Sequence, residues 1–289
     1  MKNISINSIT EAVINHGDGG KTHPRLYQIY KSLIKHFHDF VREVNLTEQE
    51  LDIGRNFLSQ VARKTTQMPE GEIVMLTDIL GISQLVDLLH HQHDGTVTES
   101  ALLGPMYLAD APKRKMGDCI GIDSDGDTLL ISGYVLDPNG KPINNALIEV
   151  WQSNSKGLYD IQDPNQQEGN FRGCFQTNAS GKYTFETVVP TSYDIAANRL
   201  SGEMLRLLGR HARRTAHIHF KLSAAGFTSL TTQIFPNNDD YLESDTAFSV
   251  ISTNIMELQK QQASDAACEG KKTFYTTKFN FVLSPTVEA

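Results

Sequence analysis

The sequence predicts an α+β fold, with helices in the first third of the chain and an antiparallel β-sandwich in the remainder. Apolar residues recur every three or four positions between residues 24 and 91, which is the period of an amphipathic helix. From about Glu99 onward, short β-forming runs alternate with Gly, Asn and Pro turns, a pattern typical of sandwiches and barrels. We therefore expect a helical domain over residues 1–105, preceded by a polar N-terminal arm, and a β-sandwich domain over residues 106–289.

Three helical segments are expected in the first domain. The first begins at Pro24 and carries one apolar stripe, formed by Leu26, Tyr30, Leu33, Phe37 and Phe40. Thr47 and Glu50 are three residues apart, a capping-box pattern that predicts the start of a second helix. A third helical segment covers residues 72–91 and is interrupted at Gly81. Because three helices bury little apolar surface by themselves, we expect them to pack on the second domain or on another subunit.

Seven β-strands are expected in the second domain, over residues 128–136, 146–151, 171–177, 182–189, 215–222, 230–235 and 273–283. The turn signal of residues 138–140 lies between the first two strands, and that of residues 178–181 lies between the next two. Both pairs are therefore predicted to be β-hairpins. A short helix is expected over residues 200–208, and residues 256–265 are interpreted as a helix or an insertion.

Composition excludes several classes of function. The chain has 289 residues, of which 39% are hydrophobic and 21% charged, as in an ordinary globular protein. A net charge of −8 argues against nucleic-acid binding, and no apolar run approaches the roughly 20 residues of a membrane helix. The first twenty residues lack the basic-then-apolar order of a signal peptide. Cys119, Cys174 and Cys268 are far apart, which fits the reducing conditions of the cytoplasm. From these observations together we expect a cytoplasmic protein with no nucleic-acid or membrane partner.

Candidate metal ligands occur close to the start of one predicted strand. His217 and His219 are two residues apart, so their side chains should leave the same face of the strand. Neutral imidazole is the commonest side-chain metal ligand, and Arg214 would place a permanent cation beside such a site. The spacing does not identify the metal, because cupins and zinc hydrolases share it. A second histidine cluster, residues 90–93, is better explained as the solvated end of a helix.

Two tyrosines follow predicted strands. Tyr159 lies beyond the strand that ends at Trp151, and Tyr193 lies beyond the strand that ends at Val189. Composition alone assigns neither a role, because tyrosines are common in loops and this chain contains nine. Their order and surroundings carry more information.

A series of ordered motifs extends from about Arg25 to Pro285. They include Phe40-Val41-Arg42-Glu43-Val44, Leu85-Val86-Asp87, Leu103-Gly104-Pro105, Gly157-Leu158-Tyr159-Asp160, Phe171-Arg172-Gly173, Ala216 to Phe220 and Thr232-Gln233-Ile234-Phe235. In this order and spacing the chain resembles the intradiol ring-cleaving dioxygenases, most closely the hydroxyquinol 1,2-dioxygenases and next the catechol 1,2-dioxygenases.

The resemblance implies one mononuclear, non-haem Fe(III) per subunit in the β-domain, with the ligands Tyr159, Tyr193, His217 and His219. A trivalent cation favours phenolate over phenol, and two anionic oxygen donors suit ferric iron. The resemblance also implies that a diol displaces Tyr193, which then takes up a proton from the substrate. Arg214 and Gln233 would be catalytic residues that stabilise negative charge in the pocket.

The implied reaction cleaves hydroxyquinol (benzene-1,2,4-triol) with O2 to 3-hydroxy-cis,cis-muconate, a tautomer of maleylacetate, in the degradation of aromatic compounds. The implied substrate pocket contains Asp87, Leu103, Gly104, Pro105, Ile195 and Ala247. Asp87 is expected to accept a hydrogen bond from the third ring hydroxyl. The alternative within the class is a catechol or substituted-catechol dioxygenase that produces cis,cis-muconates. From other classes, a non-catalytic transthyretin-like carrier could share the sandwich, and a zinc hydrolase could share the histidine pair.

By the same resemblance, the N-terminal helices form a homodimer and hold a phospholipid in a tunnel near residues 26–40. The chain departs from the family at several positions. Thr215 replaces a usual proline, and Asp194 and Ala196 replace the prolines that normally follow the second tyrosine. Residues 260–272 have no counterpart in the family pattern.

Overall fold

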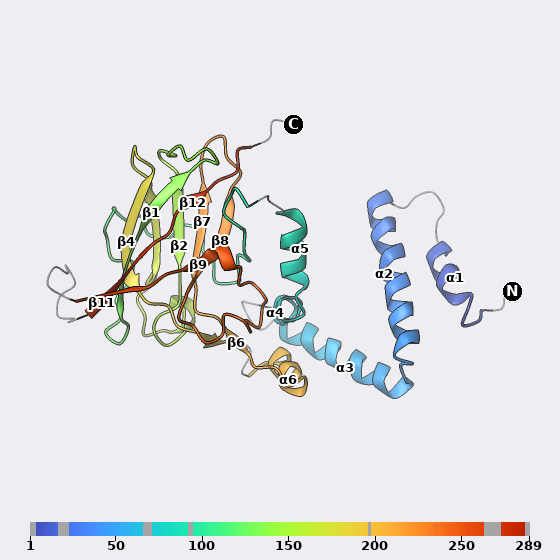
Figure 1. Cartoon of the computed structure of the whole chain (residues 1–289). Helices are drawn as coiled ribbons and strands as arrows, with labels where there is room; N and C mark the ends of the chain where they lie inside the picture. The colour runs from blue at the N-terminus through green and yellow to red at the C-terminus, as the bar shows by residue number, and fades with distance from the viewer. Residues whose placement is uncertain are drawn as a thin grey trace. The chain divides into compact units, whose positions relative to one another are not determined.

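The computed structural model describes residues 4–16, 23–65, 71–91, 95–195, 198–262 and 273–286, without the side chains of residues 65 and 273 (Figure 1). The chain forms two compact units, Met1–Gln60 and Val61–Ala289. The expected domain boundary after residue 105 lies inside the second unit, and the division at that point stays a prediction.

The first unit is helical. α1 (Ile9–Asn15) packs on α2 (Pro24–Glu43), where the hydroxyls of Tyr27 and Tyr30 donate to main-chain carbonyls of α1 at 3.2 and 3.0 Å. α1 was not predicted, because one short helix carries too little periodicity to stand out from a polar arm. The apolar stripe of α2 is exposed, with Leu26, Ile29, Leu33, Phe37 and Phe40 each 49–61% accessible.

α3 (Glu48–Thr65) extends from the first unit into the second and begins at the predicted capping box. The Thr47 hydroxyl accepts from the Glu50 N–H at 3.2 Å, and the Glu50 carboxylate accepts from the Thr47 N–H at 2.8 Å. These two bonds satisfy N–H groups that a helix start otherwise leaves without a partner.

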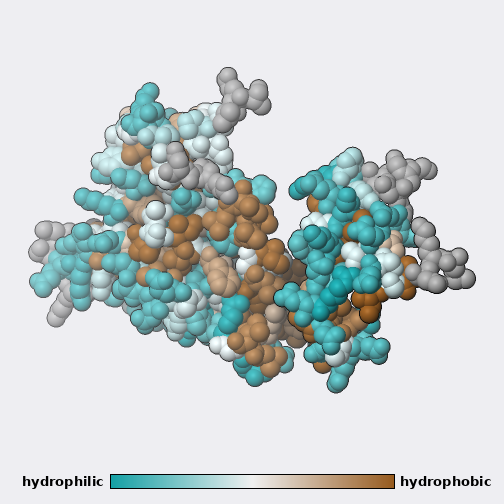
Figure 2. All heavy atoms as spheres, turned by 45° about the vertical axis from the view of Figure 1, so that its right-hand side comes forward, coloured by the Kyte–Doolittle hydropathy of each residue, from teal (hydrophilic) through white to brown (hydrophobic). Residues whose placement is uncertain are grey.

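The second unit carries α4 (Glu72–Ile79), α5 (Ile82–His90) and α6 (Leu200–Leu207). The helical segment predicted over residues 72–91 is confirmed, and it is interrupted where Gly81 adopts φ +71°. Met75 and Ile79 of α4 pack against Leu205 of α6. Among the described residues no single helix could span a membrane, although the bent pair α4–α5 meets the length and composition criteria together. Figure 2 shows that hydrophobic residues also gather on the surface of the molecule.

Two five-stranded sheets form the β part of this unit. The first contains β10 (Gln259–Gln262), β11 (Thr273–Lys278), β1 (Thr128–Leu136), β12 (Phe281–Val282) and β4 (Lys182–Val188). The second contains β3 (Arg172–Gln176), β2 (Leu147–Trp151), β7 (Ile218–Ser223), β8 (Leu230–Pro236) and β9 (Ile255–Met256). A small ladder joins β5 (Tyr193–Asp194) to β6 (Arg213–Arg214), and short 3-10 helices η1 and η2 cover Asp160–Gln162 and Ser252–Asn254.

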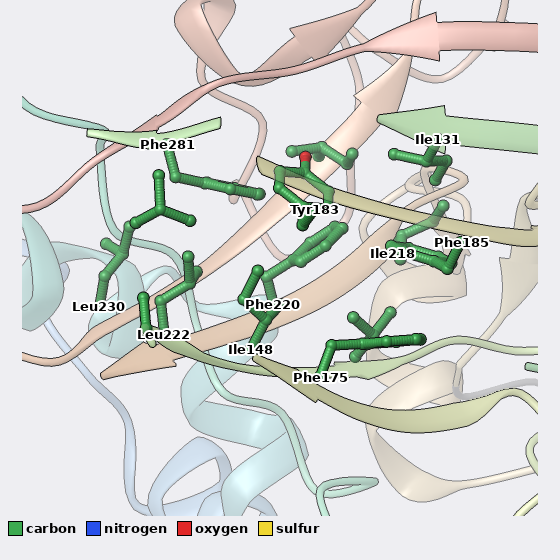
Figure 3. Close-up of a cluster of buried hydrophobic side chains, with 14 of the residues drawn as sticks. Ile131, Ile148, Phe175, Tyr183, Phe185, Ile218, Phe220, Leu222, Leu230 and Phe281 are labelled. Carbon is green, nitrogen blue, oxygen red and sulfur yellow. The ribbon is translucent and has the colours of Figure 1, made fainter. Parts of the chain in front are cut away.

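The hydrophobic core lies between the two large sheets, as Figure 3 shows. Ile131, Tyr183 and Phe281 reach it from the first sheet, and Ile218 and Phe220 reach it from the second. All five are at most 1% accessible. The predicted α+β class with a β-sandwich is therefore confirmed.

The pairing of the strands differs from the prediction. β1 pairs in parallel with β11 and β12, and β8 pairs in parallel with β9, so both sheets are mixed rather than antiparallel. The two predicted hairpins are wrong, because β1 and β2 lie in different sheets, as do β3 and β4. Both turns do form, with the N–H groups of Gly140 and Gly181 bonded at 2.9 Å to the carbonyls three residues before. A turn reverses the chain, but it does not decide whether the next strand joins the same sheet or the facing one.

Residues 256–265 do not form a helix where they are described, because Met256 belongs to β9 and β10 follows it as a strand paired with β11. The predicted helix over residues 200–208 is confirmed as α6. Cys268, Ala196, His93 and most of the 260–272 insertion lie outside the described residues.

Candidate active site

The two histidines lie at the start of β7 and face away from the core. Ile218 and Phe220 alternate with them and are fully buried between the sheets. As this alternation predicts, His217 and His219 share a face, and their Nε2 atoms are 3.1 Å apart. His217 Nδ1 lies 2.6 Å from the carbonyl oxygen of Thr215. Because a carbonyl only accepts, Nδ1 of His217 carries the proton and Nε2 keeps its lone pair for a ligand.

Tyr159 is held in place by contacts of its own main chain and of the next residue, Asp160. Its N–H donates to the side chain of Gln162 at 3.0 Å, at the start of η1. The neighbouring Asp160 forms a buried ion pair with Arg172 at 2.7 Å, and Arg172 also donates to the Met106 carbonyl at 2.7 Å. Tyr159 is 1% accessible. These contacts fix the loop that brings its phenol to the histidines.

Tyr193 reaches the same point from β5, which pairs with β6 so that Tyr193 lies opposite Arg214. Its hydroxyl is 3.3 Å from the Tyr159 hydroxyl and 3.5 Å from His217 Nε2. Gly157 makes the approach possible, because a Cβ atom there would lie 2.4 Å from Cβ of Tyr193. Gly157 also has φ +77°, a conformation that other residues rarely adopt.

The four side chains form a compact set of donor atoms. The hydroxyl of Tyr159 is also 3.5 Å from His217 Nε2. Ligands at about 2.0–2.1 Å from one ion, placed at the corners of a tetrahedron, are separated by roughly 3.3 Å, so a single metal fits the set. No group of three or more His, Cys, Asp or Glu within the described ranges could hold a metal, so an ion here requires the phenol oxygens.

Burial makes all four groups neutral when no ion is bound. It lowers the pKa of His217 to about 3, with a further contribution from the positive charge of Arg214. Burial and then His217 hold the pKa of His219 well below its usual value. Burial and the nearby Tyr193 raise the pKa of Tyr159 well above its usual value. A bound cation would supply the positive charge that reverses this preference and stabilises phenolate.

A pocket opens beside these donors. Besides the two tyrosines and two histidines, its lining includes Met75, Asp78, Leu102, Gly104, Pro105, Met106, Leu158, Asp194, Ile195, Arg199, Arg214, Gln233 and Ala247. Arg214 Nη2 donates to the side chain of Gln233 at 2.7 Å, and Arg214 Nη1 forms a short ion pair with Asp245. The guanidinium is therefore fixed at the wall of the pocket.

Six predicted catalytic or pocket residues are brought together here, namely Gly104, Pro105, Ile195, Arg214, Gln233 and Ala247. Two others are not. The Asp87 carboxylate lies in a separate depression, where it accepts from the Ser100 hydroxyl at 2.8 Å and pairs with His91 at 2.9 Å. Leu103 is 40% accessible and its neighbour Leu102 lines the pocket instead. Asp87 and Leu103 therefore do not belong to the lining of the pocket beside the four donors.

Asp78 is the acidic residue that the sequence reasoning missed. It lies on α4, three residues after Met75, and both line the pocket. Burial raises the pKa of Asp78, partly offset by a bond from Ser83 and by the charge of Arg214. Only the helical spacing from the apolar Met75 could have indicated that it faces inward.

The β-sandwich thus carries a candidate metal site, in which two tyrosines and two histidines lie beside a fixed guanidinium. Comparison with known families identifies the class of protein. Residues 23–98 match the family model for the catechol dioxygenase N terminus, and residues 102–285 match the dioxygenase family model. The chain belongs to the intradiol ring-cleavage dioxygenases.

Named relatives cover most of the chain. Hydroxyquinol 1,2-dioxygenase from Rhizobium sp. (strain MTP-10005) is 37% identical over 90% of this chain and 90% of its own. Catechol 1,2-dioxygenase from Candida albicans is 34% identical over 94% of this chain and 89% of its own. Among solved structures, hydroxyquinol 1,2-dioxygenase from Pseudomonas putida DLL-E4 has a TM-score of 0.91 and 34% identity, covering 97% of this chain and 99% of that one. Catechol 1,2-dioxygenase from Pseudomonas arvilla C-1 has a TM-score of 0.84 and 30% identity, covering 99% and 93%.

Proposed function

We propose that this chain cleaves hydroxyquinol with O2 to 3-hydroxy-cis,cis-muconate, the tautomer of maleylacetate, at one ferric ion per subunit. The ligands would be Tyr159, Tyr193, His217 and His219. The observation that carries the proposal is the set of four donor atoms in the pocket of an intradiol dioxygenase. The three donor atoms of Tyr159, Tyr193 and His217 lie 3.3–3.5 Å from one another, and Nε2 of His219 lies 3.1 Å from Nε2 of His217. A ferric ion bound there would act as a Lewis acid that binds the two adjacent hydroxyls and makes the ring reactive toward O2.

Tyr193 is the ligand that we expect to leave when a diol binds. It lies on a two-residue strand at the pocket wall and is half-buried, whereas Tyr159 is 1% accessible and is held by the Gln162 and Asp160 contacts. The phenolate oxygen of Tyr193 would then accept a proton from the substrate and become the neutral phenol. Burial raises the pKa of Tyr193, which favours the protonated phenol once it is free of the ion.

Arg214 would stabilise negative charge that develops on the substrate. Burial alone would lower its pKa, but Asp245 together with Tyr193 and Tyr159 outweighs this effect, so the pKa of Arg214 is raised and the guanidinium stays charged. Gln233 holds the second amino group of Arg214, which fixes the direction of the guanidinium. A preorganised cation in a buried pocket stabilises an anionic transition state more than a mobile one does.

Asp78 would select the substrate. Its carboxyl lines the pocket and can accept a hydrogen bond from a third ring hydroxyl, the role first assigned to Asp87. Catechol lacks that hydroxyl and would not form this hydrogen bond to the carboxylate, a loss of about 1.5–3 kcal/mol. The identity of 37% to a hydroxyquinol enzyme supports this choice, and catechol cleavage remains the alternative because a catechol enzyme is 34% identical.

The test is the colour and turnover of the iron-loaded protein. Tyrosinate bound to Fe(III) should give a charge-transfer band in the visible range that shifts when a diol is added. Tyr159→Phe and His217→Ala should lose both the band and turnover. Tyr183→Phe is the matched control, because Tyr183 is equally buried but lies on β4 of the first sheet, where its hydroxyl donates to the Phe279 carbonyl. A colourless parent protein with stoichiometric iron would exclude the proposal.

The proposal extends to partners and location. We propose a homodimer through the N-terminal helices, since the α2 stripe from Leu26 to Phe40 is exposed, and a phospholipid held near it. A cytoplasmic location is supported by the free thiols of Cys119 and Cys174. Light scattering over a dilution series tests the dimer, and lipid extraction with mass spectrometry tests the phospholipid. A monomer at all concentrations, or an extract without lipid, would contradict the respective proposal.

A further inference from the structure

Thr215 occupies the position between Arg214 and the histidine pair where the family pattern has proline. Its side chain is fully buried, and each of its polar groups has a partner. The hydroxyl donates to the Tyr241 carbonyl at 2.8 Å, and the N–H donates to Asp245 Oδ1 at 3.0 Å. The carbonyl accepts from His217 Nδ1 at 2.6 Å.

Asp245 is the centre of the contacts that hold Arg214. Its side chain is 2% accessible and binds Arg214 through Oδ2. Ser249 donates to Oδ2 of Asp245 from its N–H at 3.0 Å and from its hydroxyl at 3.1 Å. Oδ1 accepts the N–H of Thr215, which therefore fixes the second oxygen of the carboxylate and with it the rotation of the group.

The main chain of one residue, Thr215, thus contacts both parts of the site. On its N–H side it holds the carboxylate that orients the guanidinium, and on its carbonyl side it holds the imidazole ring of His217. A proline at residue 215 would keep the carbonyl contact, but it has no N–H and no hydroxyl. The difference between threonine and proline therefore acts on Arg214 and leaves the contact to His217 in place.

We propose that Thr215 is a positioning residue, whose N–H fixes Asp245 so that Arg214 points at the substrate. The inference rests on the proposed function, because Arg214 matters only if an anionic diol binds beside it. Thr215 is not a catalytic residue, since it does not line the pocket. Its effect should appear in diol binding and turnover while the metal ligands keep their arrangement.

Four variants test the inference in the iron-loaded protein. Thr215→Ser keeps both hydrogen bonds, Thr215→Val keeps only the N–H, and Thr215→Pro keeps neither. Thr177→Val is the control for loss of a buried threonine hydroxyl away from the pocket. Thr177 is 2% accessible, and its hydroxyl donates to the Ile143 carbonyl at 2.7 Å and accepts from the Ala146 N–H at 2.9 Å. The measurements are iron content, the visible band, the dissociation constant of the chromophoric diol 4-nitrocatechol, kcat/KM for hydroxyquinol and the unfolding temperature.

For Thr215→Pro we expect an unchanged iron content and band, with diol affinity and kcat/KM lower by roughly five- to tenfold, which is within the range for one lost hydrogen bond. Thr215→Ser should stay within about twofold of the parent. Thr215→Val should lose stability but keep the parent's affinity, and Thr177→Val should lose more stability because it also leaves the Ala146 N–H without its partner. Parent-like affinity and kcat/KM in Thr215→Pro would overturn the inference, as would an equal loss in Thr177→Val.

Two further outcomes are separated by the same measurements. If the parent protein shows neither the band nor turnover, the proposed function fails, whatever the variants do. If Thr215→Pro does not fold, replacement of the amide at residue 215 by an ester removes only the N–H. The expected and contradicting results for that variant are the same as for Thr215→Pro.

Discussion

The indole ring of Trp151 stacks on the imidazole ring of His219, with the centroids 4.7 Å apart and the planes 6° from parallel. The two residues face each other on neighbouring strands, because β2 and β7 pair in the register Trp151↔His219. Tyr107 also packs against Trp151 in a T-shaped arrangement, with the ring centroids 5.1 Å apart. The stack fixes the plane of the imidazole and keeps water from it, so the sheet itself orients one of the proposed ligands.

Replacing Trp151 with a smaller side chain should therefore weaken iron binding. Trp151→Leu removes the stacked plane and leaves His219 free to rotate, and we expect roughly tenfold weaker iron affinity. Trp151→Phe keeps an aromatic plane and should lose less. Iron affinity is measured by competition with a chelator. Phe220→Leu is the control, because Phe220 faces the core and should reduce stability without changing iron affinity. Equal affinities in Trp151→Leu and the parent would contradict the prediction.

The stability of the iron-free protein should fall as the pH falls below about 6.5. The folded protein lowers the pKa of His217 to about 3 and that of His219 well below its usual value. In this range the unfolded chain binds protons that the folded chain does not, so unfolding is favoured by up to about 1.4 kcal/mol per pH unit for each histidine. Chemical denaturation between pH 7 and pH 5 measures the slope.

The slope should be smaller in His217→Gln, because one titrating group is removed. His211→Gln is the matched control, because His211 is an exposed histidine outside the set of four donor side chains. An identical slope in His217→Gln and the parent would show that another group causes the acid sensitivity.

Two variants decide which aspartate selects the substrate. The structure favours Asp78, which lines the pocket, whereas the sequence predicts Asp87. In Asp78→Asn the preference for hydroxyquinol over catechol should fall by roughly tenfold, since a charged acceptor for the third hydroxyl is lost. In Asp87→Asn the preference should not change, because its carboxylate is bound to Ser100 and His91 outside the pocket. The ratio of kcat/KM for the two substrates decides this. The opposite pattern would restore Asp87 as the selecting residue.

A Cβ atom at residue 157 should disturb Tyr193. Gly157→Ala combines an unfavourable φ of +77° with a contact of 2.4 Å to Cβ of Tyr193. Gly140→Ala has a similar φ of +78° and no atom within 4 Å, so it measures the backbone effect alone, about 1–2 kcal/mol. The visible band and the unfolding free energy should both change in Gly157→Ala, and only the second in Gly140→Ala. A parent-like band in Gly157→Ala would mean that Tyr193 tolerates the displacement.

The sequence by itself determined the elements and part of the site. Helical periodicity located α2, the capping box located α3, and the alternation of apolar residues placed His217 and His219 on one face of β7. These features depend on residues a few positions apart, and local physical chemistry is sufficient for them. The order of the motifs added the two tyrosines, which no local pattern distinguished from the other seven.

Only the tertiary structure decided which strands share a sheet and which acid faces the pocket. Asp78 and Asp87 both lie on short helices, and the turn at Gly81 sends the two helices in different directions. The role of Thr215 was also invisible in the sequence, because its partner Asp245 is thirty residues away. Contacts between distant segments depend on how the whole core closes, and no short stretch of sequence carries that information.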